Sequence, residues 1–369
     1  MTLSGKKIWI DIEEPKTGIM FKSLLEKFTN DGAKILVTAR DYDSTFQILD
    51  DLNVNYVKVG SHGGATLENK MKAYINRLVD LYPKVVSFKP DYFITFSSVE
   101  GARISYGLNI PSIGYNDEPR NVPVCKLIFP YLDNIITPSC VPEQLYINLH
   151  ANPNKLIRYN GIDEIAWLSE YQPNPSILDE YNLKKGEYVL IRSEPSFASY
   201  FIDILKPEES LISKFFPPIF KEFPNHKFLI IVRTKKQELF LNEKLENYLG
   251  NSNIKITRYI PNMVDICFYS SLVISGGGTM VRESSLLNVP SIEFFPGETA
   301  PQELFLINNG FPLQHIKEID EIVKKSLEIL STKPKSDRFN NSFQEKILNF
   351  ENPNEICYNF VKKNLLERS

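Results

Sequence analysis

The sequence predicts an α/β protein of two domains, each a doubly wound parallel sheet with helices on both faces. Three observations carry this prediction. Short apolar segments alternate with helix-like segments along most of the chain. A polar stretch at residues 169–185, containing Pro173 and Pro175, interrupts the alternation near the middle and is the best linker candidate. The chain has 369 residues, enough for two hydrophobic cores.

The first half supplies strands and helices in turn and is assigned to a domain spanning residues 1–170. Residues 7–12 (KIWIDI) are typical of a buried strand. Residues 18–30 repeat apolar side chains at helical spacing, from Phe21 to Phe28, and Gly32 suits the turn that ends this helix. Further strands are predicted at 34–38, 54–59, 91–96, 110–114, 134–137 and 155–158, and further helices at 43–52 and 67–88.

The second half repeats the pattern and is assigned to a domain spanning residues 186–348, followed by a C-terminal segment, 349–369. Strands are predicted at 188–192, 227–232, 254–256, 272–274 and 291–294. Ligands of such sheets bind beyond the carboxyl ends of the strands. We therefore expect the two domains to face a cleft, and the chemistry to take place there.

Composition excludes several classes of protein. The net charge of −3 gives no reason to expect nucleic-acid binding. The four cysteines and four histidines are scattered without metal-ligand spacing, so we expect no metal site and a reducing compartment. No apolar run reaches the roughly 20 residues of a membrane span, and the N-terminus leads directly into a strand. We expect a cytoplasmic protein.

The most informative motif is a run of three glycines, Gly276, Gly277 and Gly278, between a predicted strand and a helix at 279–287. Strand, glycine turn and helix together allow backbone N–H groups to approach a phosphate closely. Glu283 lies five residues after Gly278, where a carboxylate can reach a ribose hydroxyl. The alternative is that the glycines only form a tight turn beneath a buried helix.

Polar residues also follow the strands of the first domain. His62 lies between glycines in a predicted loop and is a candidate base near neutral pH. Glu13 and Glu14 follow the first strand, where a catalytic carboxylate would belong, although two solvated loop carboxylates are the simpler interpretation. Asp117 can act in the cleft, or together with Glu118 it can cap the next helix.

Two arginines end apolar strands of the second domain. An unpaired guanidinium at the end of a buried strand is costly, so Arg192 and Arg233 require anionic partners. A diphosphate suits both of them. A structural ion pair, for example between Arg192 and Glu194, fits equally.

The arrangement resembles the GT-B glycosyltransferase superfamily, which includes the non-hydrolysing UDP-N-acetylglucosamine 2-epimerases and the UDP-N-acetylglucosamine transferases of peptidoglycan synthesis. The chain is most similar to a largely archaeal family of GT-B-like proteins. The resemblance spans nearly the whole chain. It is carried by IWIDI at residues 8–12, VTARDY at 37–42, VGSHGG at 59–64, PD at 90–91, ISGGGTMVRE at 274–283 and FPGE at 295–298.

The resemblance implies roles for residues of the second domain. The three glycines and Thr279 would hold the diphosphate of a nucleotide-sugar, and Glu283 would bind its ribose. The sugar would meet the loop that contains Glu298, Thr299, Gln302 and Glu303. Residues 352–366 would form a helix that crosses back to the first domain. Catalysis of the GT-B type requires no metal and no cofactor besides the nucleotide-sugar co-substrate.

The first loop departs from the family pattern. Related proteins carry a histidine there, whereas this chain has Glu13-Glu-Pro-Lys-Thr-Gly18 and no histidine before His62. The catalytic group would then be His62, Glu13, Glu14 or Asp117, or the chemistry differs from that of the relatives.

The leading hypothesis is a glycosyltransferase that moves a sugar from an NDP-sugar, with a UDP-sugar favoured, to a glycan or lipid-linked acceptor. A sugar-nucleotide 2-epimerase is the alternative, and a non-catalytic nucleotide-sugar-binding protein is a third possibility. Lipid-linked acceptors leave peripheral membrane contact open. The contact face would comprise Tyr74, Arg77, Leu78, Tyr82, Lys84 and Phe88, although an ordinary amphipathic helix is the favoured interpretation of that segment.

Overall fold

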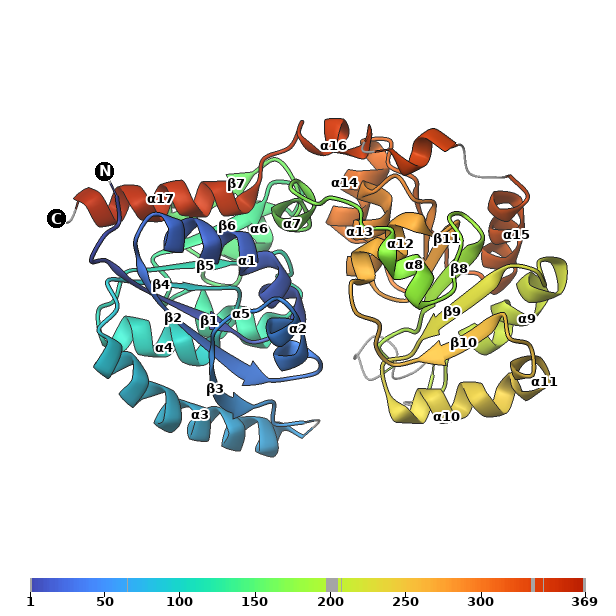
Figure 1. Cartoon of the computed structure of the whole chain (residues 1–369). Coiled ribbons are helices and arrows are strands. Elements are labelled where there is room, and N and C mark those ends of the chain that lie inside the picture. Colours follow the sequence, from blue (N-terminus) through green and yellow to red (C-terminus); the bar gives the residue numbers. More distant parts are fainter. Residues whose placement is uncertain are drawn as a thin grey trace. The chain divides into compact units, whose positions relative to one another are not determined.

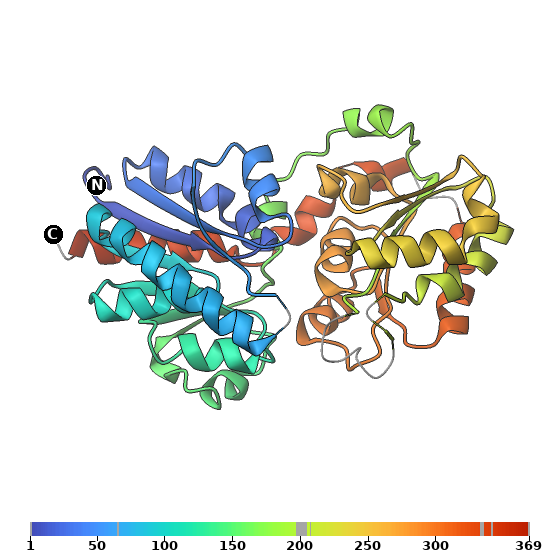
Figure 2. The same cartoon turned by 90° about the horizontal axis from the view of Figure 1, so that it is seen from below.

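The computed structural model describes residues 2–64, 66–196, 205–206, 208–332, 336–340 and 342–367 (Figures 1 and 2). Contacts between residues divide the chain into two compact units. Unit 1 comprises Met1–Ser169 and Phe350–Ser369, and unit 2 comprises Glu170–Asn349. The last helix of the chain therefore belongs to the unit formed by the first half.

Unit 1 contains a seven-stranded parallel sheet in the order β3-β2-β1-β4-β5-β6-β7. The order reverses beside β1, which pairs with β2 on one side and β4 on the other. Buried, largely apolar side chains dominate the central strands on both faces, as expected where helices cover both sides. The strands are β1 Lys7–Ile12, β2 Lys34–Asp41, β3 Val57–Ser61, β4 Tyr92–Thr95, β5 Ser112–Tyr115, β6 Asn134–Pro138 and β7 Leu156–Tyr159.

Helices connect these strands and form a layer on each face of the sheet. α1 begins with a proline in its first turn and ends before Gly32, which has a positive φ of 92°. The Thr66 side chain caps α3 by accepting a bond from Asn69 N. The helical elements are α1 Pro15–Asn30, α2 Thr45–Asp51, α3 Leu67–Phe88, α4 Val99–Gly107, α5 Val122–Ile128, α6 Glu143–Ile147, the 3-10 turn η1 Pro153–Lys155, α7 Ile165–Leu168 and α17 Pro353–Glu367.

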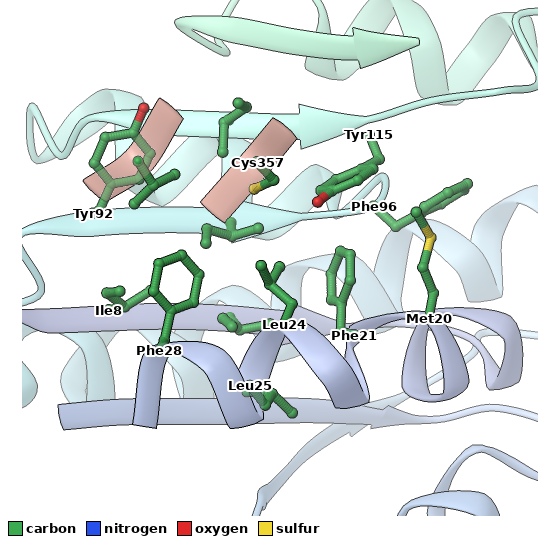
Figure 3. Packing of buried hydrophobic residues seen from close by; sticks show 14 of the residues in the cluster. Ile8, Met20, Phe21, Leu24, Leu25, Phe28, Tyr92, Phe96, Tyr115 and Cys357 are labelled. Carbon is green, nitrogen blue, oxygen red and sulfur yellow. The ribbon is translucent and has the colours of Figure 1, made fainter. Parts of the chain in front are cut away.

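Two apolar clusters lie on opposite faces of this sheet. One packs α1 and α17 against the strands, and the other packs α3, α4 and α5 (Figure 1). Figure 3 shows Phe21 and Leu24 of α1 directed toward Tyr115 of β5 and Cys357 of α17. Asn354 of α17 also accepts a hydrogen bond from the Tyr115 hydroxyl at 3.1 Å. The C-terminal helix is thus part of the unit 1 core.

Unit 2 contains a six-stranded parallel sheet in the order β10-β9-β8-β11-β12-β13, which reverses beside β8. The strands are β8 Tyr188–Arg192, β9 Lys227–Ile231, β10 Ile254–Thr257, β11 Leu272–Ser275, β12 Ser291–Glu293 and β13 Leu313–His315. The helices are α8 Ser176–Glu180, α9 Ile212–Glu222, α10 Lys235–Lys244, α11 Glu246–Leu249, α12 Met263–Tyr269, α13 Gly278–Leu286, α14 Pro301–Asn308, α15 Ile319–Leu330, η2 Ser336–Phe339 and α16 Ser342–Ile347.

The predicted fold class, two doubly wound α/β domains with parallel sheets, is confirmed. Two local predictions are incomplete. The sequence did not indicate β13, because its three residues, Leu313–His315, are too few to produce a periodic pattern. Residues 169–185 contain the boundary between the two units, between Ser169 and Glu170, and they also form α8, whose Ile177 and Leu178 are buried.

Candidate functional site

In each unit, polar residues gather where the strand order reverses. Asp11 is the penultimate residue of β1 in unit 1, and Ser98 precedes α4, the helix that follows β4. In unit 2, Glu194 follows β8 and Gly276 follows β11, the strand that pairs with β8. Open α/β sheets bind ligands at such points. The carboxyl edges of the two sheets are therefore the candidate functional regions.

A buried arginine organises the site of unit 1. Arg77 of α3 has no exposed side-chain surface and donates from Nη2 to both carboxylate oxygens of Asp11, at 2.8 and 3.0 Å. Its Nη1 donates to Glu13 Oε1 at 3.0 Å and to Glu100 Oε2 at 3.2 Å. One guanidinium thus faces three carboxyl groups in a buried environment.

The surrounding backbone and hydroxyls hold this cluster in place. The Thr38 and Ser98 hydroxyls donate to the two oxygens of Asp11 at 2.5 and 2.6 Å. Gly60 adopts a φ of +73°, and a Cβ there would lie 2.8 Å from Arg77 Cγ. The end of β3 therefore requires glycine, because the arginine passes directly beside it.

Glu13 is the member of the cluster that can exchange a proton near neutral pH. Its side chain is 13% exposed, and Arg40 Nη2 lies 3.6 Å from its Oε2. Burial raises the pKa of Glu13 to about 7, and Glu100 adds to this effect while Arg40 and Arg77 oppose it. Burial also raises the pKa of Glu14. The interpretation of Glu13 as a solvated loop carboxylate is therefore wrong, because its side chain pairs with Arg77 and Arg40.

His62 lies in the same neighbourhood, with its ring 4.6 Å from that of Tyr42. Burial, followed by the positive charges of Arg40 and Lys70, lowers its pKa. The backbone N–H of Gly64 donates to His62 Nδ1 at 3.2 Å. In the neutral imidazole this bond places the proton on Nε2, so His62 presents a donor rather than a base.

Asp117 belongs to a second charged group. Lys16 of α1 bridges Asp117 at 2.8 Å and Asp163 at 2.7 Å, and the Tyr159 hydroxyl donates to Asp163 at 2.5 Å. Burial, followed by Asp117, raises the pKa of Asp163 to about 7. The carboxylate of Asp117 is thus engaged by Lys16, and no side chain caps α5, so the capping alternative is wrong.

In unit 2, each of the three glycines is crowded by a different side chain. A Cβ on Gly276 would lie 2.5 Å from Glu194 Cβ, and one on Gly277 would lie 2.6 Å from Arg233 Nη2. A Cβ on Gly278 would lie 2.5 Å from both Arg282 Nη1 and Glu303 Oε1. α13 begins at Gly278, so this close packing surrounds N–H groups of the first turn, which have no acceptor within the helix.

Arg233 is held beside this helix terminus by residues that follow β8. Its Nε donates to the Ser193 carbonyl at 2.9 Å, and its backbone N–H donates to Ser193 Oγ at 3.2 Å. The buried Gln237 side chain accepts from Ser193 Oγ at 2.9 Å and donates to the Glu194 carbonyl at 3.0 Å. A guanidinium and a helix N-terminus therefore converge on one point, which is an arrangement suited to an anion.

The predicted ribose-binding Glu283 is 6% exposed on α13. Glu283 and Arg192 both lie near the Cys267 thiol, since burial and Glu283 raise the pKa of that thiol while Arg192 lowers it. The carboxylate of Glu194 accepts from Leu211 N at 2.6 Å and Ser210 Oγ at 2.8 Å.

The predicted sugar-binding loop has two accessible residues, Glu298 and Thr299, and two buried residues, Gln302 and Glu303. Glu298 is exposed, and the Thr299 hydroxyl bonds to His315 Nδ1, while His315 Nε2 lies 2.7 Å from the Phe295 carbonyl. Gln302 and Glu303 are 2% and 1% exposed. Glu303 Oε1 accepts from Arg282 at 2.8 Å, and Oε2 is buried without a hydrogen-bond partner within the described part of the chain.

Sequence reasoning missed several of these residues. Asp11, Lys16, Arg77, Glu100 and Asp163 complete the unit 1 site, and Arg282 and His315 line the unit 2 site. Arg77 had a detectable signal, because it stands four residues before Leu81 on the core face of α3. A charged residue at a core position requires a buried partner. No group of metal-ligating side chains occurs among residues that the structure describes.

Comparisons with known proteins agree with this architecture. A family model described as "Protein of unknown function (DUF354)" matches residues 6–364. An uncharacterised protein of Methanocaldococcus jannaschii is 25% identical over 322 residues, which cover 86% of this chain and 89% of that protein.

Solved structures with the same fold include UDP-GlcNAc 2-epimerases. That of Methanocaldococcus jannaschii has 14% identity and a TM-score of 0.64, with 93% of this chain and 98% of that chain covered. That of Neisseria meningitidis, bound to UDP-GlcNAc, has 13% identity and a TM-score of 0.66, with 98% and 100% covered. The glycotransferase of kitacinnamycin has 12% identity and a TM-score of 0.59, with 98% and 99% covered. The predicted GT-B-like fold is confirmed.

Proposed function

We propose that this chain, which belongs to the family described as "Protein of unknown function (DUF354)", is a nucleotide-sugar-dependent glycosyltransferase. Its GT-B-like fold supports this proposal. Unit 2 would bind the NDP-sugar donor, with a UDP-sugar favoured. Unit 1 would bind a glycan or lipid-linked acceptor. The observation that carries the proposal is the convergence of Arg233 and the α13 N-terminus at Gly277 and Gly278.

In this proposal the donor diphosphate binds the first turn of α13. The N–H groups of Gly278 and Thr279 would donate to phosphate oxygens, since those of Gly276 and Gly277 already donate to the Arg192 carbonyl and to Ser275 Oγ, each at 3.1 Å. Gly276 and Gly277 would form the turn beside the diphosphate, and glycine is needed at positions 277 and 278 because Arg233 and Arg282 already occupy the space of a Cβ. Arg233 would neutralise charge on the leaving diphosphate, and Arg192 would contribute from the end of β8.

The other donor contacts rest on the family resemblance. Glu283 would accept from the ribose hydroxyls. Glu298 and Thr299 would contact the sugar. Oε2 of Glu303 is buried and has no hydrogen-bond partner in the part of the chain that the structure describes, so it is an acceptor suited to a sugar hydroxyl.

Glu13 would be the catalytic base. It would remove the proton of the acceptor hydroxyl as that oxygen bonds to the anomeric carbon and the diphosphate leaves with the bonding electron pair. A pKa of about 7 allows the ionised form to act above neutral pH. His62 would donate from Nε2, and Glu14 and Asp117 would set the charge beside the base.

The experiment is incubation with radiolabelled UDP-, GDP-, CDP- and dTDP-sugars and a panel of glycan and lipid-linked acceptors. Transfer that is lost in Glu13→Gln and rises through about pH 7 in the wild type supports the proposal. Binding of nucleotide-sugars without transfer or donor hydrolysis across the panel contradicts it and favours the third hypothesis, a non-catalytic nucleotide-sugar-binding protein.

A sugar-nucleotide 2-epimerase is the second candidate. The fold similarity to UDP-GlcNAc 2-epimerases and the grouping of Glu13, Glu14, His62 and Asp117 favour it, because elimination and re-addition need more than one acid or base. Incubation with UDP-GlcNAc in deuterium oxide distinguishes the two. Deuterium at the sugar C2 indicates epimerisation, whereas unlabelled recovered sugar rules it out.

A further inference from the structure

Helix α3 carries a row of large apolar side chains on its solvent side. They follow one another at spacings of three or four residues and therefore share one face of the helix. We call this row the α3 stripe. It consists of Leu67, Met71, Ile75, Val79, Tyr82 and Val86, with exposed fractions of 84, 59, 52, 68, 52 and 40%.

The α3 stripe differs from the contact face predicted from the sequence. In that prediction Arg77 and Leu78 pointed outward, but Arg77 is fully buried against Asp11 and Leu78 packs into the core cluster. Tyr74 and Phe88 are also partly buried, which leaves Tyr82 and Lys84 as the exposed members. The predicted face is therefore wrong. A sequence pattern identifies an apolar face but does not say whether it meets the sheet or the solvent.

Neighbouring helices extend the apolar surface. α4 packs beside α3 on the same face of the unit 1 sheet. Tyr106 of α4 is 60% exposed, Leu108 follows it, and Val122 and Leu127 of α5 are 40% and 51% exposed. In the described part of the chain, helices α1, α2, α7 and α17 on the other face present no large apolar side chain of comparable exposure.

The charges of this surface are opposite in sign to those of the whole chain. Its exposed basic residues outnumber its exposed acidic residues by five to two, although the net charge of the chain is −3. The two buried charged residues of these helices, Arg77 and Glu100, pair with each other. The exposed ones are Lys70, Lys72, Lys84, Arg103 and Lys126 against Glu68 and Asp80.

An exposed apolar row on a surface with more exposed basic than acidic residues matches the surface that peripheral proteins present to anionic lipid headgroups. We propose that the outer surface of α3, α4 and α5 docks on an anionic lipid bilayer, with the α3 stripe at the boundary between headgroups and acyl chains. α3 begins directly after the loop that carries His62, so docking would bring the carboxyl edge of the unit 1 sheet near the lipid surface. The inference does not depend on the reaction that the protein catalyses.

The test is flotation of the full chain with vesicles of phosphatidylcholine alone and of phosphatidylcholine mixed equally with phosphatidylglycerol. We expect binding to the anionic vesicles that weakens with salt. Ile75→Ser/Val79→Ser should reduce the partition coefficient by about tenfold or more, because two apolar side chains leave the lipid. Lys72→Glu/Lys84→Glu should reduce it by at least about 25-fold, from about fivefold per lysine.

The matched control is Leu239→Ser/Leu348→Ser, which changes two side chains of unit 2 with similar exposure, 59% and 70%. This variant should float like the wild type. The proposal is overturned if the wild type does not bind anionic vesicles, or if the stripe and control variants behave alike. It is also overturned if light scattering reveals a dimer that only the stripe variant abolishes, because the surface would then bind a second copy of the chain.

Discussion

The raised pKa of Glu13 predicts how the free energy of unfolding depends on pH. In the unfolded chain the carboxyl ionises at its ordinary pKa of 4.5, whereas in the folded protein burial keeps it protonated up to about pH 7. Between these two values the folded state binds more protons than the unfolded state, so the free energy of unfolding falls as the pH rises. Each pH unit between two pKa values corresponds to about 1.4 kcal/mol. The ionisation of Glu13 should therefore lower the free energy of unfolding of the wild type by about 2 kcal/mol between pH 5.5 and pH 8.

Glu13→Gln removes this dependence while retaining an oxygen that can accept from Arg77. The free energy of unfolding of the variant, relative to that of the wild type, should therefore be about 2 kcal/mol higher at pH 8 than at pH 5.5. Urea unfolding followed by tryptophan fluorescence measures the difference. Both tryptophans, Trp9 and Trp167, lie in unit 1, so the signal reports the unit that contains Glu13.

Glu26→Gln is the matched control, since Glu26 is 57% exposed on α1 and pairs only with Lys22 among the contacts described. Its effect should be the same at both pH values. If the difference in free energy of unfolding between Glu13→Gln and the wild type is as independent of pH as that of Glu26→Gln, the carboxyl of Glu13 ionises as an exposed group does. The account of the buried cluster would then be refuted.

Three other predictions follow from the packing. Gly276→Ala should destabilise unit 2 by about 1–3 kcal/mol, because the added Cβ would meet the Glu194 backbone. Gly250→Ala is the control, since a Cβ there would have nothing within 4 Å, and equal melting temperatures for the two variants would contradict the prediction. Asp11→Asn should lower the free energy of unfolding, measured in urea, by about 3–5 kcal/mol, because it removes the charge that Arg77 binds through two hydrogen bonds. A decrease below about 1 kcal/mol would argue against a buried ion pair. The His62 C2 proton should titrate in NMR with a midpoint below 6.5, and a midpoint above that value would mean that Glu13 outweighs burial and Arg40.

Much of the fold could be predicted because it depends on local patterns. β1 and β8 coincide with their predicted ranges, since each is a short apolar run between polar residues. α3 spans Leu67–Phe88 as expected from its periodicity. β13 could not be predicted, because its pairing with β12 is a tertiary contact that three residues do not encode.

The site was predictable only in part. The loops after the strands led to the prediction of Glu13, His62 and the three glycines as site residues, because open α/β sheets bind ligands at that edge. Side chains that reach the edge from a distance were not identified. Arg77 comes from the middle of a helix, 66 positions from Asp11, and Asp163 lies 147 positions from Lys16. Such pairs form only when the sheet brings their elements together.

Binding of a nucleoside diphosphate to wild-type protein and to Arg233→Gln tests the central claim most directly. Isothermal titration calorimetry with UDP should give binding that weakens at least about tenfold in Arg233→Gln, the loss of one charge-assisted contact. Arg258→Gln, which changes an exposed arginine of unit 2 that pairs with Glu238, should bind like the wild type. Equal affinity for all three proteins, or no binding of UDP, GDP, CDP or dTDP, would contradict a nucleotide-sugar site at the N-terminus of α13.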